Sequence, residues 1–158
     1  MGADRWHPRL ATADDADEVA QLLHDFNSEF GTPSPGGDVL AARLRVLLAG
    51  DATIAIIAGT PAAVGMALVT LRPNVWYAGQ VALLDELYVV PHMRGRGIGS
   101  AIIDRLMSTS RARGVDLIEI NVDEDDVDAQ RFYERHGFSS TEPGSTERSF
   151  YYSQDLTS

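Results

Sequence analysis

The sequence predicts an α/β or α+β fold with a mixed sheet, on three observations. First, residues 52–58 and 63–71 are apolar runs rich in β-branched residues, and the breakers between them are typical of a hairpin. Second, residues 81–90 form another strand-like run that ends at Pro91, because proline cannot continue a ladder. Third, strand and helix patterns alternate in the second half of the chain, and over the whole chain the expected strands outnumber the expected helices.

Two amphipathic helices are expected before the hairpin. Apolar residues on one helical face predict a first helix that begins near Asp14, with Thr12 or Asp14 as its cap. These residues are Val19, Leu22, Leu23, Phe26 and Phe30. Residues 32–37, rich in proline and glycine, end this helix. Leucines at helical spacing then predict a second helix, and they are Leu40, Leu44, Leu47 and Leu48.

The second half of the chain predicts a helix, a strand and another helix. Apolar spacing from Ile98 indicates a helix that stops at Gly114. Residues 115–122 are typical of a strand, and residues 129–136 form a short helix closed by Gly137.

The tail predicts a last hairpin, with Phe138 and residues 150–152 on its two arms. Exposed aromatic side chains on such a hairpin are consistent with a homodimer.

Composition indicates one ordinary globular domain over residues 1–158. With 44% hydrophobic and 23% charged residues the chain is too apolar to stay disordered. It contains no cysteine, which excludes disulfides, thiolate catalysis and cysteine metal sites. All its basic residues are arginine, and the formal net charge of −10 opposes binding to nucleic acid or to an anionic membrane. Cationic partners are favoured instead.

Neither a metal site nor a membrane anchor is expected. The histidines, His7, His24, His92 and His136, show none of the helical pair spacings of zinc sites. The apolar stretch 52–69 is interrupted by a turn, which favours two strands over a membrane span. The first residues lack a secretory apolar region and a myristoylation signal, so we expect a cytoplasmic protein.

The chemistry is concentrated in a glycine-rich junction between a strand end and a helix start. Glycines at 95, 97 and 99 let the backbone approach a ligand closely, and the free N–H groups of the first helical turn favour an anion. Arg94 and Arg96 strengthen this cradle. The alternative is a turn that only joins two elements. The segment fits neither the dinucleotide fingerprint nor the P-loop, so magnesium-dependent phosphoryl transfer is not expected.

Two segments together resemble the GNAT superfamily of N-acetyltransferases. Residues 94–99 match the pattern Arg-x-x-Gly-x-Gly, and residues 129–138 read Ala-Gln-Arg-Phe-Tyr-Glu-Arg-His-Gly-Phe. The first is similar to the acetyl-CoA diphosphate loop of that superfamily, and the second to its helix near the C-terminus. The similarity at the level of motifs extends from about residue 84 to residue 138. It implies a mostly antiparallel sheet of about six or seven strands flanked by about four helices.

The resemblance also implies acetyl-CoA as co-substrate, with no metal. The backbone of the strand that precedes the loop would pair with the pantetheine arm and direct an N–H at the thioester oxygen. The residues concerned are Leu87, Tyr88 and Val89. The main-chain amides of the loop would hold the diphosphate at the helix N-terminus. That loop comprises Arg94, Gly95, Arg96, Gly97, Ile98, Gly99 and Ser100.

Asp85 and Glu86 are the candidates for the general base that takes the proton of the attacking amine. Strand alternation sends adjacent side chains to opposite faces unless the strand bulges there. The pair is similar to that of spermidine/spermine-type acetyltransferases, whose first carboxylate is the proton acceptor. We therefore expect Asp85 to be the base, with Glu86 in reserve. Either carboxylate could instead be a solvated strand residue or an arginine partner.

Tyr133 is the candidate general acid, since a phenol within reach can protonate the departing thiolate. A buried core tyrosine is the alternative. Direct transfer in a ternary complex is expected, because the chain has no cysteine and no Gly-x-Ser-x-Gly elbow.

One departure from the superfamily pattern is Asp126, where an asparagine is usual, within the acidic run 123–128. Acidic residues favour a helix N-terminus and can face solvent; the alternative is that they attract a cationic substrate. His92 is assigned no catalytic role.

The acceptor is expected to be a small cationic amine, such as a polyamine, a diamine or an aminoglycoside-like molecule. Trp76 and Tyr77 could form an aromatic wall for it, or cover a sheet edge or a subunit interface. Two other functions stay open: a non-catalytic acyl-CoA-binding module, and an acetyltransferase for protein N-termini or lysines.

Overall fold

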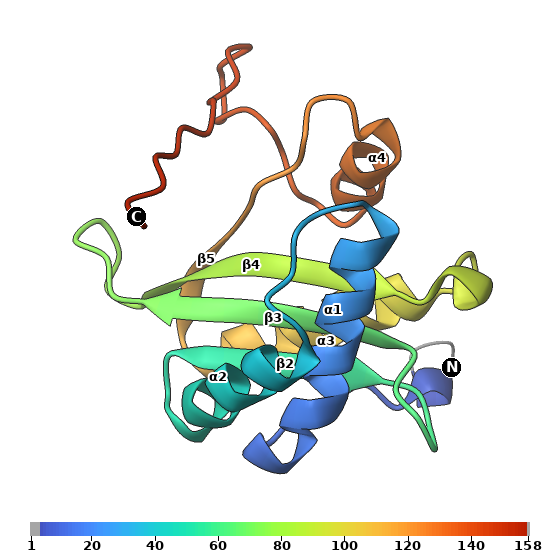
Figure 1. Cartoon of the computed structure of the whole chain (residues 1–158). Helices are drawn as coiled ribbons and strands as arrows, with labels where there is room; N and C mark the ends of the chain where they lie inside the picture. Colours follow the sequence, from blue (N-terminus) through green and yellow to red (C-terminus); the bar gives the residue numbers. More distant parts are fainter. Residues whose placement is uncertain (1–3, 158) are drawn as a thin grey trace. The chain divides into compact units, whose positions relative to one another are not determined.

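The computed structural model describes residues 4–157, and within them it contains four α-helices and a five-stranded sheet (Figure 1). The strands are β1 (Arg9–Leu10), β2 (Thr53–Ala58), β3 (Gly65–Arg72), β4 (Gln80–Val89) and β5 (Val115–Ile120). The helices are α1 (Ala16–Glu29), α2 (Gly37–Ala49), α3 (Ile98–Ala112) and α4 (Val127–Arg135). The sheet order is β1-β2-β3-β4-β5. Neighbouring strands are antiparallel except β4 and β5, which are parallel.

The chain divides into two compact units, Met1–Ile120 and Asn121–Ser158. The first unit holds the whole sheet with α1, α2 and α3, and the second holds α4 and the tail. A single domain over the whole chain stays a prediction.

The mixed fold class is confirmed, but the strand count is lower than expected. In the described part of the tail the predicted hairpin is reduced to one isolated bridge, between Thr141 and Arg148. Residues 139–149 are almost entirely small and polar, so they lack the apolar face that stabilises a hairpin. Phe150 and Tyr152 are 69% and 88% exposed, respectively, and belong to no strand.

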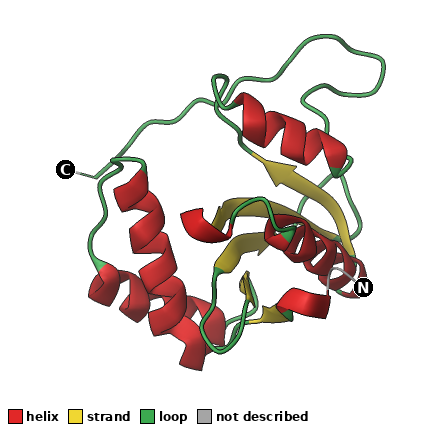
Figure 2. Cartoon of the chain, turned by 90° about the vertical axis from the view of Figure 1, so that its right-hand side faces the viewer, coloured by secondary structure: helices red, strands yellow, loops and turns green. Residues whose placement is uncertain are grey.

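The first unit has helices on both faces of the sheet. On one face α1 and α2 share a core with sheet residues such as Ile57, Met66 and Tyr88. On the other face lies α3, so close to β3 that a Cβ added to Gly65 would meet the side chain of Ile98 at 2.9 Å. Figure 2 shows helices on both sides of the strands. Burial of both faces explains why the β2 run is apolar throughout.

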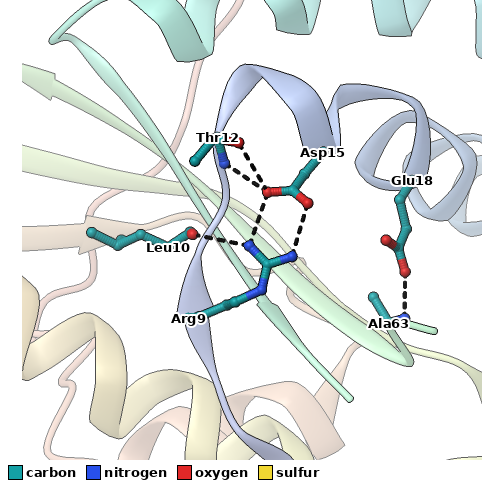
Figure 3. A network of polar contacts seen from close by, with 6 residues as sticks. All are labelled: Arg9, Leu10, Thr12, Asp15, Glu18 and Ala63. Carbon is teal, nitrogen blue, oxygen red and sulfur yellow. Dashed lines mark hydrogen bonds and ion pairs between the residues drawn. The ribbon is translucent and has the colours of Figure 1, made fainter. Parts of the chain in front are cut away.

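A polar network fixes the start of α1, as Figure 3 shows. The predicted cap Thr12 caps a 3-10 turn, Ala13–Asp15, and α1 begins directly after it. Asp15 accepts hydrogen bonds from the Arg9 guanidinium at 2.8 and 2.9 Å and from the Thr12 N–H at 2.8 Å. Arg9 is the main cause that lowers the pKa of Asp15 to about 2. Further along α1, the Glu18 carboxylate accepts from the Ala63 N–H in the turn between β2 and β3.

The start of β4 lies against the start of β5 at Gly79. Its N–H donates to Asp116 Oδ2 at 2.6 Å, and a Cβ there would lie 2.0 Å from the Gly114 carbonyl oxygen. Only glycine permits this approach. Gly114 ends α3 with φ of 72°, as the sequence predicts.

The apolar stretch 52–69 forms β2 and part of β3. Among residues 4–157 we find no helix with the length and apolar character needed to cross a bilayer.

Candidate active site

A β-bulge interrupts β4 at the acidic pair. Leu84 pairs with Val69 and Glu86 pairs with Leu68, so Asp85 is an extra residue with no partner on β3. A bulge of this kind bends the strand and changes the direction of the side chains next to it.

The bulge places both carboxylates on one face of the sheet. Thr70 Oγ1 donates a hydrogen bond to Asp85 Oδ2 at 2.6 Å, and Glu86 lies opposite Leu68. Thr70 and Leu68 share a face because strand residues alternate. That face also carries Met66, which packs in the core formed with α1 and α2. Asp85 and Glu86 therefore share a face because the strand bulges, which is the one case in which the sequence analysis allows it.

The two carboxylates differ in environment. Asp85 is exposed, whereas Glu86 is partly buried. Burial, and secondly the neighbouring charge of Asp85, raises the pKa of Glu86 above its usual value. An ionised Glu86 is thus a stronger proton acceptor than an ordinary glutamate.

Beyond the bulge, no strand among residues 4–157 pairs with the outer edge of β4, which we call the free edge. β5 pairs with β4 only as far as Leu84, opposite Ile120. On the other side, the Val90 N–H donates to the Val64 carbonyl at 2.9 Å. Val64 and Val90 are therefore a hydrogen-bonded pair of the antiparallel ladder, and the next pair, Gly65 and Val89, is a non-hydrogen-bonded pair. In such a pair the N–H and C=O groups of each residue point away from the opposite strand.

Two residues earlier on β4, the N–H and C=O groups of Leu87 have the same orientation as those of Val89. The N–H and C=O groups of Leu87 and Val89 therefore point away from β3, toward the free edge. The side chain of Tyr88 points the opposite way from its neighbours, is 4% exposed and stacks on Phe26 with ring centroids 4.9 Å apart.

The glycine loop has an open outer side. Gly95 and Gly97 have φ of 75° and 84°, and a Cβ on either would meet no atom within 4 Å. Gly97 is the N-cap of α3, whose first amides have no intrahelical partner. Behind the loop, Trp6 Nε1 donates to the Arg96 carbonyl at 3.2 Å, and buried Ile98 anchors the helix start. The loop is therefore held from behind, while the sides of Gly95 and Gly97 that would carry a Cβ are open.

Arg94 is not directed at the loop. Its guanidinium forms two 2.8 Å hydrogen bonds with the Glu29 carboxylate at the end of α1, and its Nε donates to the Val89 carbonyl at 2.9 Å. The Tyr88 hydroxyl donates to the same carboxylate at 3.1 Å. Mainly because of Arg94, the pKa of Glu29 lies below its usual value. Sequence reasoning missed Glu29. The signal was its position in the last turn of a helix, where the dipole disfavours an acid.

Tyr133 lies on α4, in the second unit. Its ring makes edge-to-face contacts with Phe132 and Phe138, with centroids 5.1 and 5.8 Å apart. The Asp126 side chain caps this helix by accepting from the Ala129 N–H at 3.0 Å. Helix capping is therefore confirmed for the acidic residue that departs from the superfamily pattern. The role of Tyr133 as a proton donor stays a prediction.

Three other residues that the sequence singles out are exposed, and they are Trp76, Tyr77 and His92. Trp76 is 85% exposed and Tyr77 is 41% exposed, at the turn between β3 and β4, so Trp76 does not cover a sheet edge. His92 lies exposed in the 3-10 turn Pro91–Met93. Among the described residues there is no group of three His, Cys, Asp or Glu side chains that could hold a metal.

Comparison with known proteins agrees with this geometry. The profile of the acetyltransferase (GNAT) family matches residues 17–138, from α1 through the end of α4. The chain belongs to this family. A crystal structure of a candidate acetyltransferase from Arthrobacter sp. FB24 is 54% identical, covers 94% of this chain and 95% of its own, and superposes with a TM-score of 0.88.

Curated relatives match this GNAT chain only in part. Mycothiol acetyltransferase of Beutenbergia cavernae is 38% identical over 72 residues, which are 44% of this chain and 24% of the relative. Aminoalkylphosphonate N-acetyltransferase of Salmonella typhimurium is 32% identical over 78 residues, 49% of this chain and 51% of the relative. The chain thus spans about half or less of the length of these relatives.

Aminoglycoside acetyltransferase meta-AAC0020, from an uncultured soil metagenomic sample, shares the fold. Its structure, solved with trehalose, is 20% identical, covers 96% of this chain and 99% of its own, and has a TM-score of 0.76.

Proposed function

We propose that this GNAT chain transfers the acetyl group of acetyl-CoA to a primary amine of a small cationic molecule, by direct attack in a ternary complex. The observation that carries the proposal is the bulge at Asp85. It sets two carboxylates beside the point where the free edge of β4 begins. A thioester bound along the free edge would then lie next to a carboxylate that can accept a proton.

The donor site consists of the free edge and the loop. Acetyl-CoA, the acyl donor of this family, supplies an activated thioester when it is bound. The N–H and C=O groups of Leu87 and the N–H of Val89 are available to pair with its amide-containing arm. The main-chain amides of the glycine loop and of the first turn of α3 would hold its diphosphate at the positive end of that helix. The residues present thus fit the ligand.

We propose Glu86 as the general base, in place of Asp85. Glu86 is partly buried and has the raised pKa, whereas Asp85 is exposed and accepts a hydrogen bond from Thr70. The ionised Glu86 takes a proton from the substrate ammonium, directly or through water. The amine nitrogen then attacks the thioester carbon, and the Leu87 N–H stabilises the oxyanion. The C–S bond breaks, the thiolate takes the Tyr133 phenol proton, and the nitrogen loses its second proton to water, from which the phenolate is protonated again.

The charge of the chain supports a cationic acceptor. The formal net charge is −10, and Asp85 next to Glu86 attracts ammonium groups. An aminoglycoside and an aminoalkylphosphonate enzyme among the similar proteins act on small amines, according to their names. A cytoplasmic location and a homodimer are also proposed.

Release of free CoA thiol from acetyl-CoA across an amine panel tests the function. The panel contains diamines, polyamines, aminoglycosides and a peptide with a free N-terminus and a lysine. We expect small cationic amines to accelerate thiol release by at least about a hundredfold over buffer, and Glu86→Gln to remove most of that gain. If the chain binds CoA but no amine accelerates release, it is a binding module, and the proposal fails. Preference for the peptide would contradict the small-amine acceptor.

A further inference from the structure

Glu29 makes contacts that its position on α1 does not explain. As the last residue of the helix it faces the negative end of the helix dipole, which disfavours an acid. Its side chain is 26% exposed, and its carboxylate receives two parallel hydrogen bonds from Arg94, each 2.8 Å long. Such a forked pair is the most strongly directional ion pair in proteins. The Tyr88 hydroxyl adds a third bond at 3.1 Å.

Arg94 connects this pair to the free edge of β4. While both of its terminal nitrogens bind Glu29, its Nε donates to the Val89 carbonyl at 2.9 Å. The guanidinium carbon also lies 5.6 Å from the centroid of the Tyr88 ring. The Val89 carbonyl is one of the groups that point away from β3. Arg94 therefore occupies the last acceptor of the edge, directly before the turn that leads into the glycine loop.

The consequence is a fixed end to the free edge. Because Arg94 already uses one lone pair of the Val89 carbonyl, an extended ligand pairs most readily with the two polar groups of Leu87 and the N–H of Val89. Loss of the Glu29 carboxylate would release the guanidinium into its other rotamers, because one neutral carbonyl holds arginine weakly. The end of β4 and the first residues of the loop would then lose a common support.

We infer that Glu29 is a positioning residue of the acyl-donor site, which holds Arg94 so that the free edge ends at Val89 and the glycine loop starts in register. The inference rests on the proposed donor site. It assigns to α1 a part in binding the acyl donor, although Glu29 contacts that site only through the side chains of Arg94 and Tyr88.

A different role for Glu29 predicts the opposite result. If Glu29 only neutralised Arg94, its replacement by glutamine would leave a free cation near a polyanionic ligand and would tighten CoA binding. Positioning predicts weaker binding despite that gain in positive charge. The sign of the change therefore separates the two roles.

Calorimetric titration of CoA into the wild type, Glu29→Gln and Asp25→Asn tests the inference. Asp25 lies one turn earlier on α1, where it binds Gln21 and not Arg94, so its variant changes the charge equally and keeps the pair. We expect Glu29→Gln to weaken CoA binding about tenfold, or about 1.4 kcal/mol, and Asp25→Asn to leave it unchanged. The KM for acetyl-CoA should rise while kcat at saturating acetyl-CoA stays within about twofold. Arg94→Lys keeps the charge, loses the forked pair and should behave like Glu29→Gln.

Equal or tighter CoA binding by Glu29→Gln would overturn the inference. So would a fall in kcat and thermal midpoint with an unchanged KM, because that pattern indicates a purely structural role. If Glu29→Gln does not fold, Arg94→Lys decides the question by the same readouts. A wild type that fails to bind CoA contradicts the donor site itself, so the two failures are distinguishable.

Discussion

Asp85 and Glu86 are consecutive residues of one strand, yet their side chains lie on the same face of the sheet. A regular strand would separate them. The bulge makes Asp85 a fixed negative neighbour of Glu86, held by the Thr70 hydroxyl. It also bends β4 where the pairing with β5 stops, so one backbone irregularity arranges both the charge pair and the free edge.

The first prediction concerns the pH dependence of kcat/KM. Because the pKa of Glu86 is raised, activity should increase with pH through a value above that of an ordinary glutamate. In Asp85→Asn burial still raises this pKa but the smaller contribution of the neighbouring charge is gone, so the rise should move slightly to lower pH while activity persists. In Glu86→Gln the rise should disappear. Persistence of the rise in Glu86→Gln and its loss in Asp85→Asn would instead assign the base to Asp85.

The second prediction is that Glu86→Gln stabilises the fold at neutral pH. Burial opposes ionisation of Glu86, so the folded pKa lies above the unfolded one. The wild type therefore loses stability as pH rises from the unfolded pKa through the folded one, whereas glutamine does not titrate. Urea unfolding should give equal midpoints at acidic pH and a higher midpoint for the variant at pH 7. A lower midpoint at pH 7 would show that the carboxylate is favourable where it lies.

The third prediction concerns the Arg9–Asp15 pair. The folded pKa of Asp15 is about 2, below its usual value of 3.8, so the pair stabilises the fold above the unfolded pKa. This stability is lost as pH falls through the folded pKa. Discounted for solvent screening at the exposed arginine, Asp15→Asn should cost about 1–2 kcal/mol at pH 7 and only a small part of that near pH 2.

The control for this experiment is Asp17→Asn. Asp17 forms an ion pair with Arg45 in which the two side chains are 77% and 52% exposed, so its loss should cost less than about 0.5 kcal/mol. Equal costs for the two variants at pH 7 would contradict the special role of Asp15.

The fourth prediction concerns Ser110 on α3. Its side chain is 3% exposed, and its hydroxyl has no hydrogen-bond partner among the described residues. Ser110→Ala removes a buried unsatisfied group and favours the helix, so it should stabilise the chain by about 0.5–1.5 kcal/mol. Ser108 on the same helix donates to the Arg105 carbonyl at 3.1 Å, and Ser108→Ala should gain less. Thermal unfolding compares the two, and a destabilised Ser110→Ala would contradict the assignment.

Local patterns predicted most of the first unit. The breakers at 59–61 separate β2 from β3, and Gly114 ends α3, because turns and helix ends depend on nearby residues. The tail hairpin failed for a physical reason: its aromatic residues are separated by a polar segment with too few apolar side chains to order it.

The site was predicted in residue type more than in arrangement. Which face Asp85 occupies depends on the register between β3 and β4, and a register shift is not visible in the β4 residues alone. The pairing of Arg94 with Glu29 joins residues far apart in sequence, so no local pattern contains it. The open space above Gly95 and Gly97, in contrast, follows the glycine pattern directly.

The central claim is that the amides at the start of α3 bind the diphosphate of acetyl-CoA. Calorimetric titration of CoA into Gly97→Asn and Gly114→Asn tests it most directly. These glycines bracket α3, have φ of 84° and 72°, and both face open space, so asparagine, which tolerates this conformation, strains both similarly. We predict that Gly97→Asn weakens CoA binding at least about tenfold, while Gly114→Asn binds as the wild type does. Equal binding by all three proteins would contradict the claim.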